Sequence, residues 1–418
     1  MFKILSIDGG GIRGIIPAKI LALAEEELKR TNHACRICDY FDLICGTSTG
    51  GIIAIGLALG MPAHEILSLY RDNAKTIFPP QNNFYKVLKI LFKKELYKRE
   101  DLKHFLSEFY DRYAGDSPAR LGHCLTRVCI PAYDADRGMM HVFKTSHHPQ
   151  LTRDYQIPAC DIALSTAAAP VYFDSYDFEY TIKEGTEIHR YKSMIDGGIM
   201  ANNPTLIGYT EAVHSLNIPV SKIAIFSLGT GNRMFKDNPQ KMTGRYWLYN
   251  KKPLPLYDLI SSAQADYTDN LMKFYQKGIG VGGEQNFIYC RLQHSFENDN
   301  VIGLDASDKQ SIDTLENIGQ CVFSDNQTQI MDFFNNQNQE YRGYYGVKQS
   351  RNKSKKIHVI ALVHRYFIDL ISFIFLTVKN LFLVHFCCTF VTRNKIIFIT
   401  LTSEKPEWGH KIETNKSI

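Results

Sequence analysis

The sequence predicts an α/β fold in which a mostly parallel central sheet is flanked by helices on both faces. Three observations lead to this prediction. Short apolar runs that are typical of buried strands recur as far as Leu228. The first two runs are each followed by a glycine-rich turn and then by a helical pattern. Long stretches separate the later runs, and parallel strands require such crossover connections.

The chain begins with two strand–turn–helix units. The run Phe2–Ile7 predicts the first strand, and the sequence after Gly14 predicts a helix because its apolar residues recur at helical spacing. Those residues are Ile16, Ile20, Leu23 and Leu28. Residues 40–45 predict the second strand. Residues 51–60 predict a helix that is apolar on nearly all sides and is therefore central.

The later elements are spaced more widely. Residues 127–132 and 222–228 predict two further strands, separated by stretches that include a helix-poor region at 181–191. Helical patterns at 258–277 and 308–320 close the body of the protein. Asn- and Gln-rich sequence then leads to a boundary near residues 343–354. We therefore expect one domain over residues 1–345 and a C-terminal extension over residues 346–418.

The charge of the chain is unevenly distributed. Its 44% hydrophobic and 22% charged residues are typical of a globular protein. From Gly346 onward there are 12 Lys and Arg against 4 Asp and Glu, whereas the preceding residues carry 36 against 39. On charge alone, the basic extension suits an anionic membrane surface or nucleic acid equally well. The body shows no basic patch typical of a nucleic-acid reader, and we expect no nucleic-acid partner.

The extension is hydrophobic as well as basic. Residues 357–402 are rich in Phe, Ile, Leu and Val, but charged residues interrupt them. The longest uncharged stretches, 370–378 and 380–392, fall short of the roughly 20 residues that span a bilayer. We therefore expect no regular transmembrane helix. Three alternatives stay open: an interfacial or re-entrant hydrophobic hairpin, a helical cap on the body, and a tail that is not well folded.

The start of the sequence and its cysteines bear on location. The chain opens directly on a strand-like run, without the segments of a Sec-type signal peptide. We expect a cytoplasmic or peripheral membrane protein with free thiols, and signal-less secretion stays open. Cys35 and Cys38 form a lone C-x-x-C without a second pair at zinc-finger spacing, so we expect no metal there.

The first motif that carries chemistry is G-x-S-x-G, formed by Gly46, Ser48 and Gly50. It stands between a predicted strand and a predicted helix, which is the context of a nucleophile elbow. Its glycines let two chain segments pass close to a serine held on a strained turn. The following helix directs its positive N-terminal end toward the serine oxygen. We therefore expect Ser48 to be a nucleophile.

The second motif is DGGGIRG at residues 8–14, which has two interpretations. Its G-x-G-x-x-G pattern between strand and helix is also a dinucleotide-binding fingerprint. Asp39 and Asp42 lie near the distance where that fingerprint requires an acidic residue, but neither ends a convincing strand. Alternatively, the loop presents backbone N–H groups to an oxyanion that develops during acyl transfer.

A serine nucleophile needs a base. His214 or His294 would supply it in a histidine-dependent esterase, although neither lies in a recognisable turn motif. The alternative is Asp196, which follows the apolar pair Met194 and Ile195 and precedes two glycines. A carboxylate at a strand end can reach Ser48, and its burial would raise its pKa toward a value suited to a base.

These three motifs, in this order, resemble those of the patatin-like phospholipase family. The segments STAAAPVYF at 165–173, ANNP at 201–204 and SLGTG at 227–231 are also similar to segments characteristic of the family. The resemblance covers about residues 1–340. It implies a patatin-like catalytic domain with a Ser-Asp dyad, acting on acyl esters of glycerolipids through an acyl-enzyme and without a catalytic histidine.

Carried over by position, the resemblance assigns roles to individual residues. Ser48 matches the nucleophile and Asp196 the proton acceptor. The oxyanion loop corresponds to Gly9, Gly10, Gly11, Ile12 and Arg13. The remaining motif glycines are Gly14, Gly46, Gly50, Gly197 and Gly198. Arg13 is expected either to hold the loop through an ion pair or to attract a phosphate. The extension after about Gly346 departs from the family pattern.

The resemblance also implies the partners. The expected substrate is a phospholipid or galactolipid, no cofactor or metal is required, and the sequence identifies no activator. Residues 84–99 predict a basic amphipathic helix that either lies on an anionic bilayer or packs its apolar side on the core. A catalytically silent lipid-binding protein on the same fold is the alternative function.

Overall fold

In the computed structural model of this chain, two compact units are present, Met1–Gly346 and Val347–Ile418. The structure describes residues 1–31, 35–80, 96–183, 185–233, 255–278, 287–297, 301–337, 341 and 343–345, together with two strands of the second unit. The predicted amphipathic helix lies outside the described residues from Phe84 to Glu95.

An eight-stranded mixed sheet forms the centre of the first unit. Its order is β5-β6-β3-β2-β1-β7-β9, and β4 also pairs with β3. The strands are β1 (Phe2–Ile7), β2 (Leu43–Gly46), β3 (Arg127–Asp134), β4 (Met139–Lys144), β5 (Tyr176–Thr181), β6 (Ile188–Asp196), β7 (Ile223–Leu228) and β9 (Ile288–Leu292). The pairs among β3, β2, β1, β7 and β9 are parallel, whereas β4, β5 and β6 pair antiparallel.

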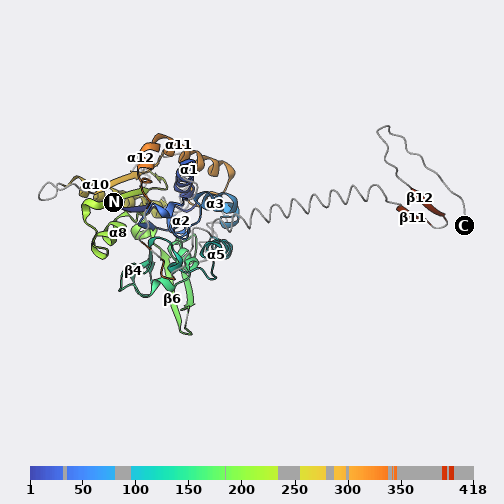
Figure 1. Ribbon diagram of the computed structural model, residues 1–418, viewed down its shortest axis with the longest axis horizontal. Coiled ribbons are helices and arrows are strands. Elements are labelled where there is room, and N and C mark those ends of the chain that lie inside the picture. The colour runs from blue at the N-terminus through green and yellow to red at the C-terminus, as the bar shows by residue number, and fades with distance from the viewer. Residues whose placement is uncertain are drawn as a thin grey trace. The chain divides into compact units, whose positions relative to one another are not determined.

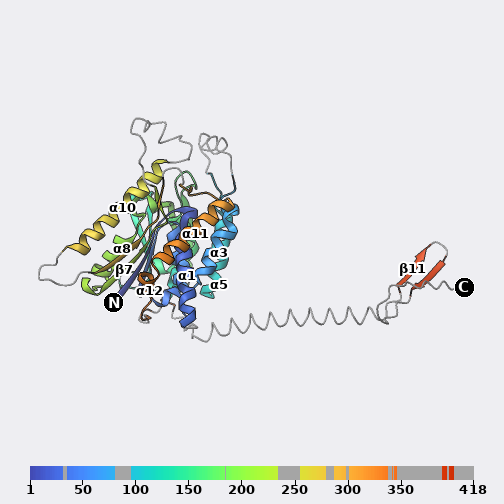
Figure 2. The same cartoon turned by 90° about the horizontal axis from the view of Figure 1, so that it is seen from above.

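Helices cover both faces of the sheet. Figure 2 shows α1, α3, α5 and α11 on one side, and α8 and α10 on the other. The helices are α1 (Ile15–Thr31), α2 (Thr49–Ala58), α3 (Ala63–Ile77), α5 (Glu100–Ala114), α6 (Ala159–Thr166), α7 (Gly198–Ala201), α8 (Thr205–Thr210), α10 (Pro255–Lys277), α11 (Lys309–Asp325) and α12 (Gln327–Asp332). The predicted α/β architecture is confirmed.

The two faces of the sheet belong to separate hydrophobic clusters. Successive strand residues point to opposite faces, and this alternation divides β1: Leu5 belongs to the larger cluster, with α1, α2 and α3, whereas Ile4 belongs to the smaller. Ala212 and Met272 contribute to the smaller cluster from the side of α8 and α10. Burial on both faces explains why β1 and β7 are mostly apolar and do not alternate strictly between apolar and polar residues.

The pairing of β3 brings two distant chain segments together. One edge of β3 is occupied by β4, which pairs with residues 129–134. The other edge is shared, because β2 pairs parallel with residues 127–129 and β6 pairs antiparallel with residues 132–134. The C-terminal ends of β2 and β6 therefore point toward each other along β3. Figure 1 shows β4 and β6 together at one end of this unit, away from α11 and α12.

The predicted elements differ from the observed ones mainly at their ends, and several observed elements had no predicted counterpart. A 3-10 turn at Ile37–Asp39 precedes β2, so the second strand begins later than residue 40. The helix-poor region at 181–191 lies largely within the β5–β6 hairpin. Strands β4, β5 and β9 were not predicted. Strand β5 buries every second side chain, and this alternation was a readable signal in the sequence.

In the second unit, the structure describes an antiparallel pair of strands, β11 (Cys388–Thr392) and β12 (Lys395–Ile399). The open alternatives for residues 357–402 otherwise lie outside the described residues. Across the part of the chain that the structure describes, no helix combines the length and the apolar character needed to cross a membrane.

Candidate active site

Ser48 lies on a sharp turn between β2 and α2. Its backbone has φ 54° and ψ −124°, a conformation that L-residues rarely adopt. The turn is kept tight by Gly50, because a Cβ atom there would lie 2.2 Å from the carbonyl oxygen of Ile7. The Ser48 N–H group donates to Thr166 Oγ1 at 3.0 Å. The turn therefore holds the Ser48 side chain at the end of the sheet and at the N-terminus of α2.

Asp196 is the last residue of β6 and is fully buried. Its Oδ2 atom accepts a hydrogen bond from the Ser48 hydroxyl at 2.7 Å. Its Oδ1 atom accepts from the Gly198 N–H group at 2.6 Å, which fixes the orientation of the carboxylate. The two side chains are 148 residues apart in the chain. They meet because β2 and β6 end against each other on one edge of β3.

The surroundings of Asp196 contain neutral hydrogen-bond donors. Burial raises the pKa of Asp196 to about 6, although hydrogen bonds from Ser48, Gly198 and Tyr257 act in the opposite direction. A carboxyl group with a pKa near 6 is ionised at neutral pH and is still basic enough to accept a proton. Tyr257 was not predicted from the sequence, because it comes from α10 and no local motif marks it.

The glycine loop after β1 borders Ser48. A Cβ atom at Gly9 would lie 3.2 Å from Ser48 Cβ. Three of the five predicted N–H donors bond to backbone carbonyls of the protein itself: Gly9 to Asn202, Ile12 to Leu304, and Arg13 to Gly10. Within the described residues, the N–H groups of Gly10 and Gly11 have no such partner. Of the five predicted donors, the N–H groups of Gly10 and Gly11 are therefore the best candidates to bind an oxyanion.

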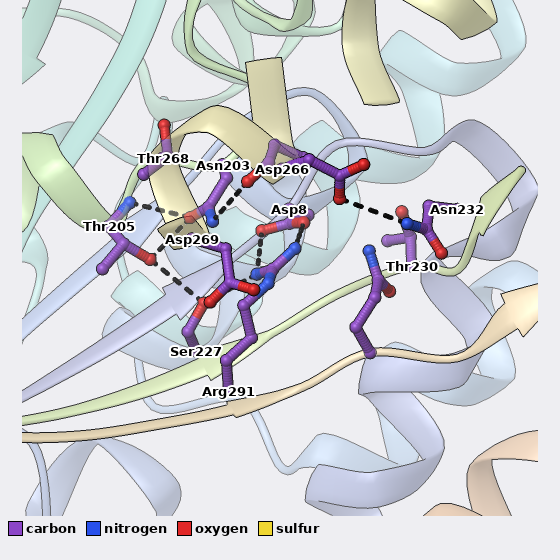
Figure 3. A network of polar contacts seen from close by, with 12 residues as sticks. Asp8, Asn203, Thr205, Ser227, Thr230, Asn232, Asp266, Thr268, Asp269 and Arg291 are labelled. Atoms are coloured by element: carbon purple, nitrogen blue, oxygen red, sulfur yellow. Dashed lines mark hydrogen bonds and ion pairs between the residues drawn. The ribbon is translucent and has the colours of Figure 1, made fainter. Parts of the chain in front are cut away.

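A buried ion pair anchors the start of this loop. Asp8 and Arg291 form two hydrogen bonds, with Nη1 to Oδ1 at 3.1 Å and Nη2 to Oδ2 at 2.6 Å. Arg291 also donates to Ser227 Oγ at 2.8 Å. Figure 3 shows Asp8 and Arg291 facing each other, with Ser227 and Thr205 beside them. Strands β1, β7 and β9 are thereby joined directly below the glycine loop.

The three supporting segments noted in the sequence each contact a motif. Thr166 binds the Ser48 turn, and its hydroxyl donates to Pro131. The Asn202 carbonyl accepts the N–H of Gly9 at 3.0 Å. The Thr230 hydroxyl donates to the Gly9 carbonyl at 2.5 Å. These segments therefore fix the relative positions of the serine turn and the glycine loop.

The other motif glycines are packing positions. A Cβ atom at Gly14 would meet Thr49, one at Gly46 would meet Gly50, and one at Gly197 would meet the carbonyl of Pro131. Each of these approaches would be 2.4 Å or shorter. Only glycine fits such distances, so these residues allow the loops to converge.

A cavity opens above Ser48. The glycine loop, Ser48 and Asn202 contribute to its lining, together with Tyr257 and Ser261 of α10. Apolar side chains from α2, α3, α5 and the loop after α6 complete it: Ile52, Ile77, Leu102, Tyr172 and Phe173. The hydrogen-bonded side chain of Ser48 therefore lies in the wall of a cavity whose other lining residues are largely apolar.

Several candidate residues lie apart from the Ser48–Asp196 pair. Arg13 lines the cavity, but its guanidinium also lies 3.4 Å from Asp258, as expected for the ion-pair alternative. His214 is exposed on a π-helix at Glu211–Ser215. His294 packs against the ring of Phe296. The hydrogen bond that the Ser48 hydroxyl donates goes to Asp196 and not to either histidine.

The C-x-x-C pair is buried. Burial raises the pKa of Cys35 and raises that of Cys38 to about 12, so both thiols stay protonated at neutral pH.

Comparisons with known proteins agree with the motif analysis. The patatin-like phospholipase family model matches residues 5–209. Patatin-like protein 2 of Arabidopsis thaliana is 31% identical over 346 residues, which cover 76% of this chain and 82% of that protein. The cGAMP-activated phospholipase of Escherichia coli (strain TW11681) is 34% identical over 251 residues, which cover 59% of this chain and 66% of that protein.

Among solved structures, a match was found to VipD from Legionella pneumophila. The match covers 79% of this chain and 66% of that chain, with 13% sequence identity and a TM-score of 0.36. The family assignment comes instead from the sequence relatives. With 31% identity over 82% of a patatin-like protein, and with a family model whose match spans residues 5–209, this chain belongs to the patatin-like phospholipase family of lipid hydrolases.

Proposed function

We propose that this protein hydrolyses fatty-acyl ester bonds of phospholipids or related glycerolipids through a Ser48–Asp196 dyad and an acyl-enzyme. The observation that carries the proposal is the 2.7 Å hydrogen bond between Ser48 Oγ and Asp196 Oδ2 on a strained strand-to-helix turn. A serine oriented toward a base in this way is the basic requirement for nucleophilic catalysis.

In the first half of the reaction, Asp196 accepts the hydroxyl proton as Ser48 Oγ attacks the ester carbonyl carbon. The negative charge that forms on the carbonyl oxygen is stabilised by the N–H groups of Gly10 and Gly11 and by the N-terminus of α2. The tetrahedral intermediate then collapses, the bond to the alcohol oxygen breaks, and the protonated Asp196 gives its proton to that oxygen. The lysolipid leaves, and the acyl group remains on Ser48.

In the second half, a water molecule takes the place of the alcohol. Asp196 accepts a proton from the water as its oxygen attacks the acyl carbon, and the same N–H groups hold the second oxyanion. The bond to Ser48 Oγ breaks, Asp196 returns the proton to Oγ, and the fatty acid is released. No step uses a metal ion, so we expect the hydrolytic step to proceed in the presence of a chelator.

The apolar side chains of the cavity support an acyl chain as the group bound beside Ser48. Burial of apolar surface stabilises such a complex at roughly 25 cal/mol per Å². Because one relative is named a cGAMP-activated phospholipase, the assay should be run with and without cGAMP. The proposal itself does not require an activator of that kind.

The test uses the full purified chain and vesicles of mixed phospholipid and galactolipid, with released fatty acids and lysolipids measured by mass spectrometry. We expect release by the wild type and loss of release in Ser48→Ala. The controls His214→Ala and His294→Ala should retain release, because neither histidine bonds to Ser48. Equal release by wild type and Ser48→Ala would overturn the dyad. Loss in His294→Ala alone would favour a histidine-dependent esterase.

A further inference from the structure

A second cluster of reactive side chains lies apart from the dyad and plays no part in the proposed hydrolysis. It consists of Cys129 on β3, His147 just after β4, and Glu211 at the first residue of the π-helix. One thiol, one ring nitrogen and one carboxylate oxygen from these residues lie within 4.8 Å of one another. Cys129 belongs to the smaller hydrophobic cluster, on the side of the sheet covered by α8 and α10.

The cluster is withdrawn from solvent. Cys129 is fully buried, and the side chains of His147 and Glu211 are 0% and 5% exposed. A thiol, an imidazole and a carboxylate are an unusual set to place inside an apolar cluster, because each loses its hydration there. Buried groups of these types are usually paired or coordinate metals. A π-helical turn also occurs frequently at functional sites.

The neighbours of the cluster fix the orientation of the His147 ring and of the Glu211 carboxylate. Thr145 Oγ1 lies 2.8 Å from His147 Nδ1, which leaves Nε2 facing Glu211 Oε1 at 2.9 Å. Lys144 binds the other carboxylate oxygen, Oε2, at 2.5 Å. In metal sites, hydrogen bonds of this kind from surrounding residues hold the ligand ring and the ligand carboxylate in place.

A fourth donor is adjacent. Cys45 is the register partner of Cys129 on the neighbouring strand, and the two thiols are hydrogen-bonded. With both thiols deprotonated, two thiolates, the Glu211 carboxylate and the Lys144 ammonium sum to −2, and His147 stays neutral. A divalent cation therefore brings the site to zero net charge, which is the condition under which a buried charged cluster is tolerated.

From this arrangement we propose that Cys129, His147 and Glu211, with Cys45 as the fourth ligand, form a structural zinc site. The set of sulfur, nitrogen and oxygen donors fits Zn²⁺, whereas Mg²⁺ and Ca²⁺ prefer oxygen ligands. In a tetrahedral zinc site, donor atoms lie about 3.5 Å apart. The donor atoms of Cys129, His147 and Glu211 lie within 4.8 Å of one another, so side-chain shifts of about 1 Å would bring these three onto the ion. Binding releases the two thiol protons. His147 would coordinate through Nε2 with its proton on Nδ1, from which it donates a hydrogen bond to Thr145 Oγ1.

The expected effect of zinc is to join four segments that are otherwise held by packing and hydrogen bonds: strand β2, strand β3, the loop after β4, and the π-helix. Cys45 lies three residues before Ser48 in the chain, yet zinc takes no part in the proposed hydrolysis. Binding is therefore measured in the Ser48→Ala chain as well as in the wild type. Failure of the zinc proposal is thereby separated from failure of the dyad.

The experiment measures zinc per chain by elemental mass spectrometry after expression of the full protein in zinc-supplemented medium. We expect about one zinc per chain in the wild type and in Ser48→Ala. In Cys129→Ser and His147→Gln the affinity for zinc should fall by more than about 100-fold, so that these variants are isolated with little bound zinc. The matched control is Cys290→Ser, a buried thiol of the larger hydrophobic cluster, which should retain its zinc.

Two measurements on the wild type do not depend on the folding of any variant. Added Zn²⁺ should raise the melting temperature of the chelator-treated protein, whereas Mg²⁺ should not. Replacement by Co²⁺ should give a thiolate-to-cobalt charge-transfer band in the wild type. A wild type without bound zinc and without a zinc-dependent shift in melting temperature would overturn the proposal. Zinc binding that is unchanged in Cys129→Ser would overturn it as well.

Discussion

Two buried carboxylates in this molecule have opposite electrostatic surroundings. Asp196 accepts hydrogen bonds from a serine, a tyrosine and a backbone N–H, and its pKa is raised to about 6 by burial. Burial also acts to raise the pKa of Glu211, but hydrogen bonds and charges from His147 and Lys144 outweigh it and bring the pKa to about 2. The difference lies in the neighbours, because only Glu211 has a lysine in contact.

This difference separates a carboxylate that can exchange a proton from one that stays ionised. A base near neutral pH must gain and lose a proton at low cost, and a neutral environment makes this possible. A carboxylate bound to a lysine is fixed in its charged form and serves as an anchor or a ligand. The absence of a cation beside Asp196, within the described residues, is therefore as important for its proposed role as its distance from Ser48.

The largest expected effect follows from Asp196→Asn. Loss of the base should lower kcat by about 10⁴-fold, the size of the loss that an Asp→Asn change causes in a Ser-His-Asp triad. The same change should stabilise the fold at neutral pH. The native state holds the Asp196 proton more tightly than the unfolded chain does, so the wild type loses about 3 kcal/mol as the pH rises from about 4 to about 6. The amide side chain of the variant carries no charge, so its burial does not cause this loss of stability.

Urea unfolding of the wild type and Asp196→Asn over this pH range measures the stability difference. It should be near zero below pH 4 and largest above pH 6, in favour of the variant. Asp136→Asn, which removes an exposed carboxylate, should change neither activity nor this pH dependence. A variant less stable than the wild type at pH 8 would contradict the interpretation of Asp196 as a carboxylate without a compensating cation.

The Asp8–Arg291 pair offers a third environment for comparison, a carboxylate held by two guanidinium hydrogen bonds. Arg291→Leu should lower the free energy of unfolding by about 3–5 kcal/mol, because it leaves a buried carboxylate without its cation. Arg291→Lys should recover only part of this loss, since an ammonium cannot form the paired hydrogen bonds. Urea unfolding measures both effects.

The control for Arg291 is a surface ion pair. Arg190 lies 2.7 Å from Glu179, and both side chains are more than half exposed. Arg190→Leu should therefore cost no more than about 1 kcal/mol. Equal losses in Arg190→Leu and Arg291→Leu would show that burial does not set the strength of the Asp8–Arg291 pair.

Glu211→Gln should have a smaller effect and the opposite pH dependence from Asp196→Asn. Its lowered pKa means that ionised Glu211 stabilises the fold by about 2–3 kcal/mol at neutral pH, reduced by the partial exposure of Lys144. The stability advantage of the wild type should be complete above pH 5 and should disappear as the pH falls toward 2. Unfolding in zinc-free buffer measures this. An advantage that grows on acidification would contradict the assigned pKa direction.

The sequence predicted the parts of the site that have local signals. Ser48 and Gly10 lie in turns that directly follow apolar strands, and a strand–turn–helix pattern can be read within about a dozen residues. The prediction of Asp196 as the base rests on a local signal of the same kind, an apolar pair followed by two glycines. Such motifs can be read because the local chain itself imposes the geometry.

The remaining parts depend on contacts between distant segments. Arg291 reaches Asp8 across 283 residues, and Thr166 reaches Ser48 across 118. Neither residue differs in its local pattern from many others in the chain. The sequence also proposed five oxyanion donors, because it could not show that three of the N–H groups bind carbonyls brought near by folding. Hydrogen-bond partners that lie so far apart in the chain can be identified only when the topology of the sheet is known.

The smallest expected effect comes from Tyr257→Phe, and it tests the environment of Asp196 most directly. The variant keeps the aromatic ring on α10 but removes a hydrogen bond to the carboxylate. Loss of a donor disfavours the ionised form, so the pKa of Asp196 should rise above its present value of about 6. A hydrogen bond worth about 1 kcal/mol corresponds to a shift of about 0.7 pKa units.

The pH profile of kcat/KM reports this shift. Because activity requires ionised Asp196, the rate should fall as the pH decreases through the pKa, and the midpoint should move upward in Tyr257→Phe. At pH 8 the variant should approach the wild-type rate, whereas at pH 6 it should be several-fold slower. Tyr267→Phe, an exposed tyrosine on the same helix, is the matched control. A uniform rate loss at every pH would assign Tyr257 to packing of the cavity instead, because repacking leaves the ionisation of Asp196 unchanged.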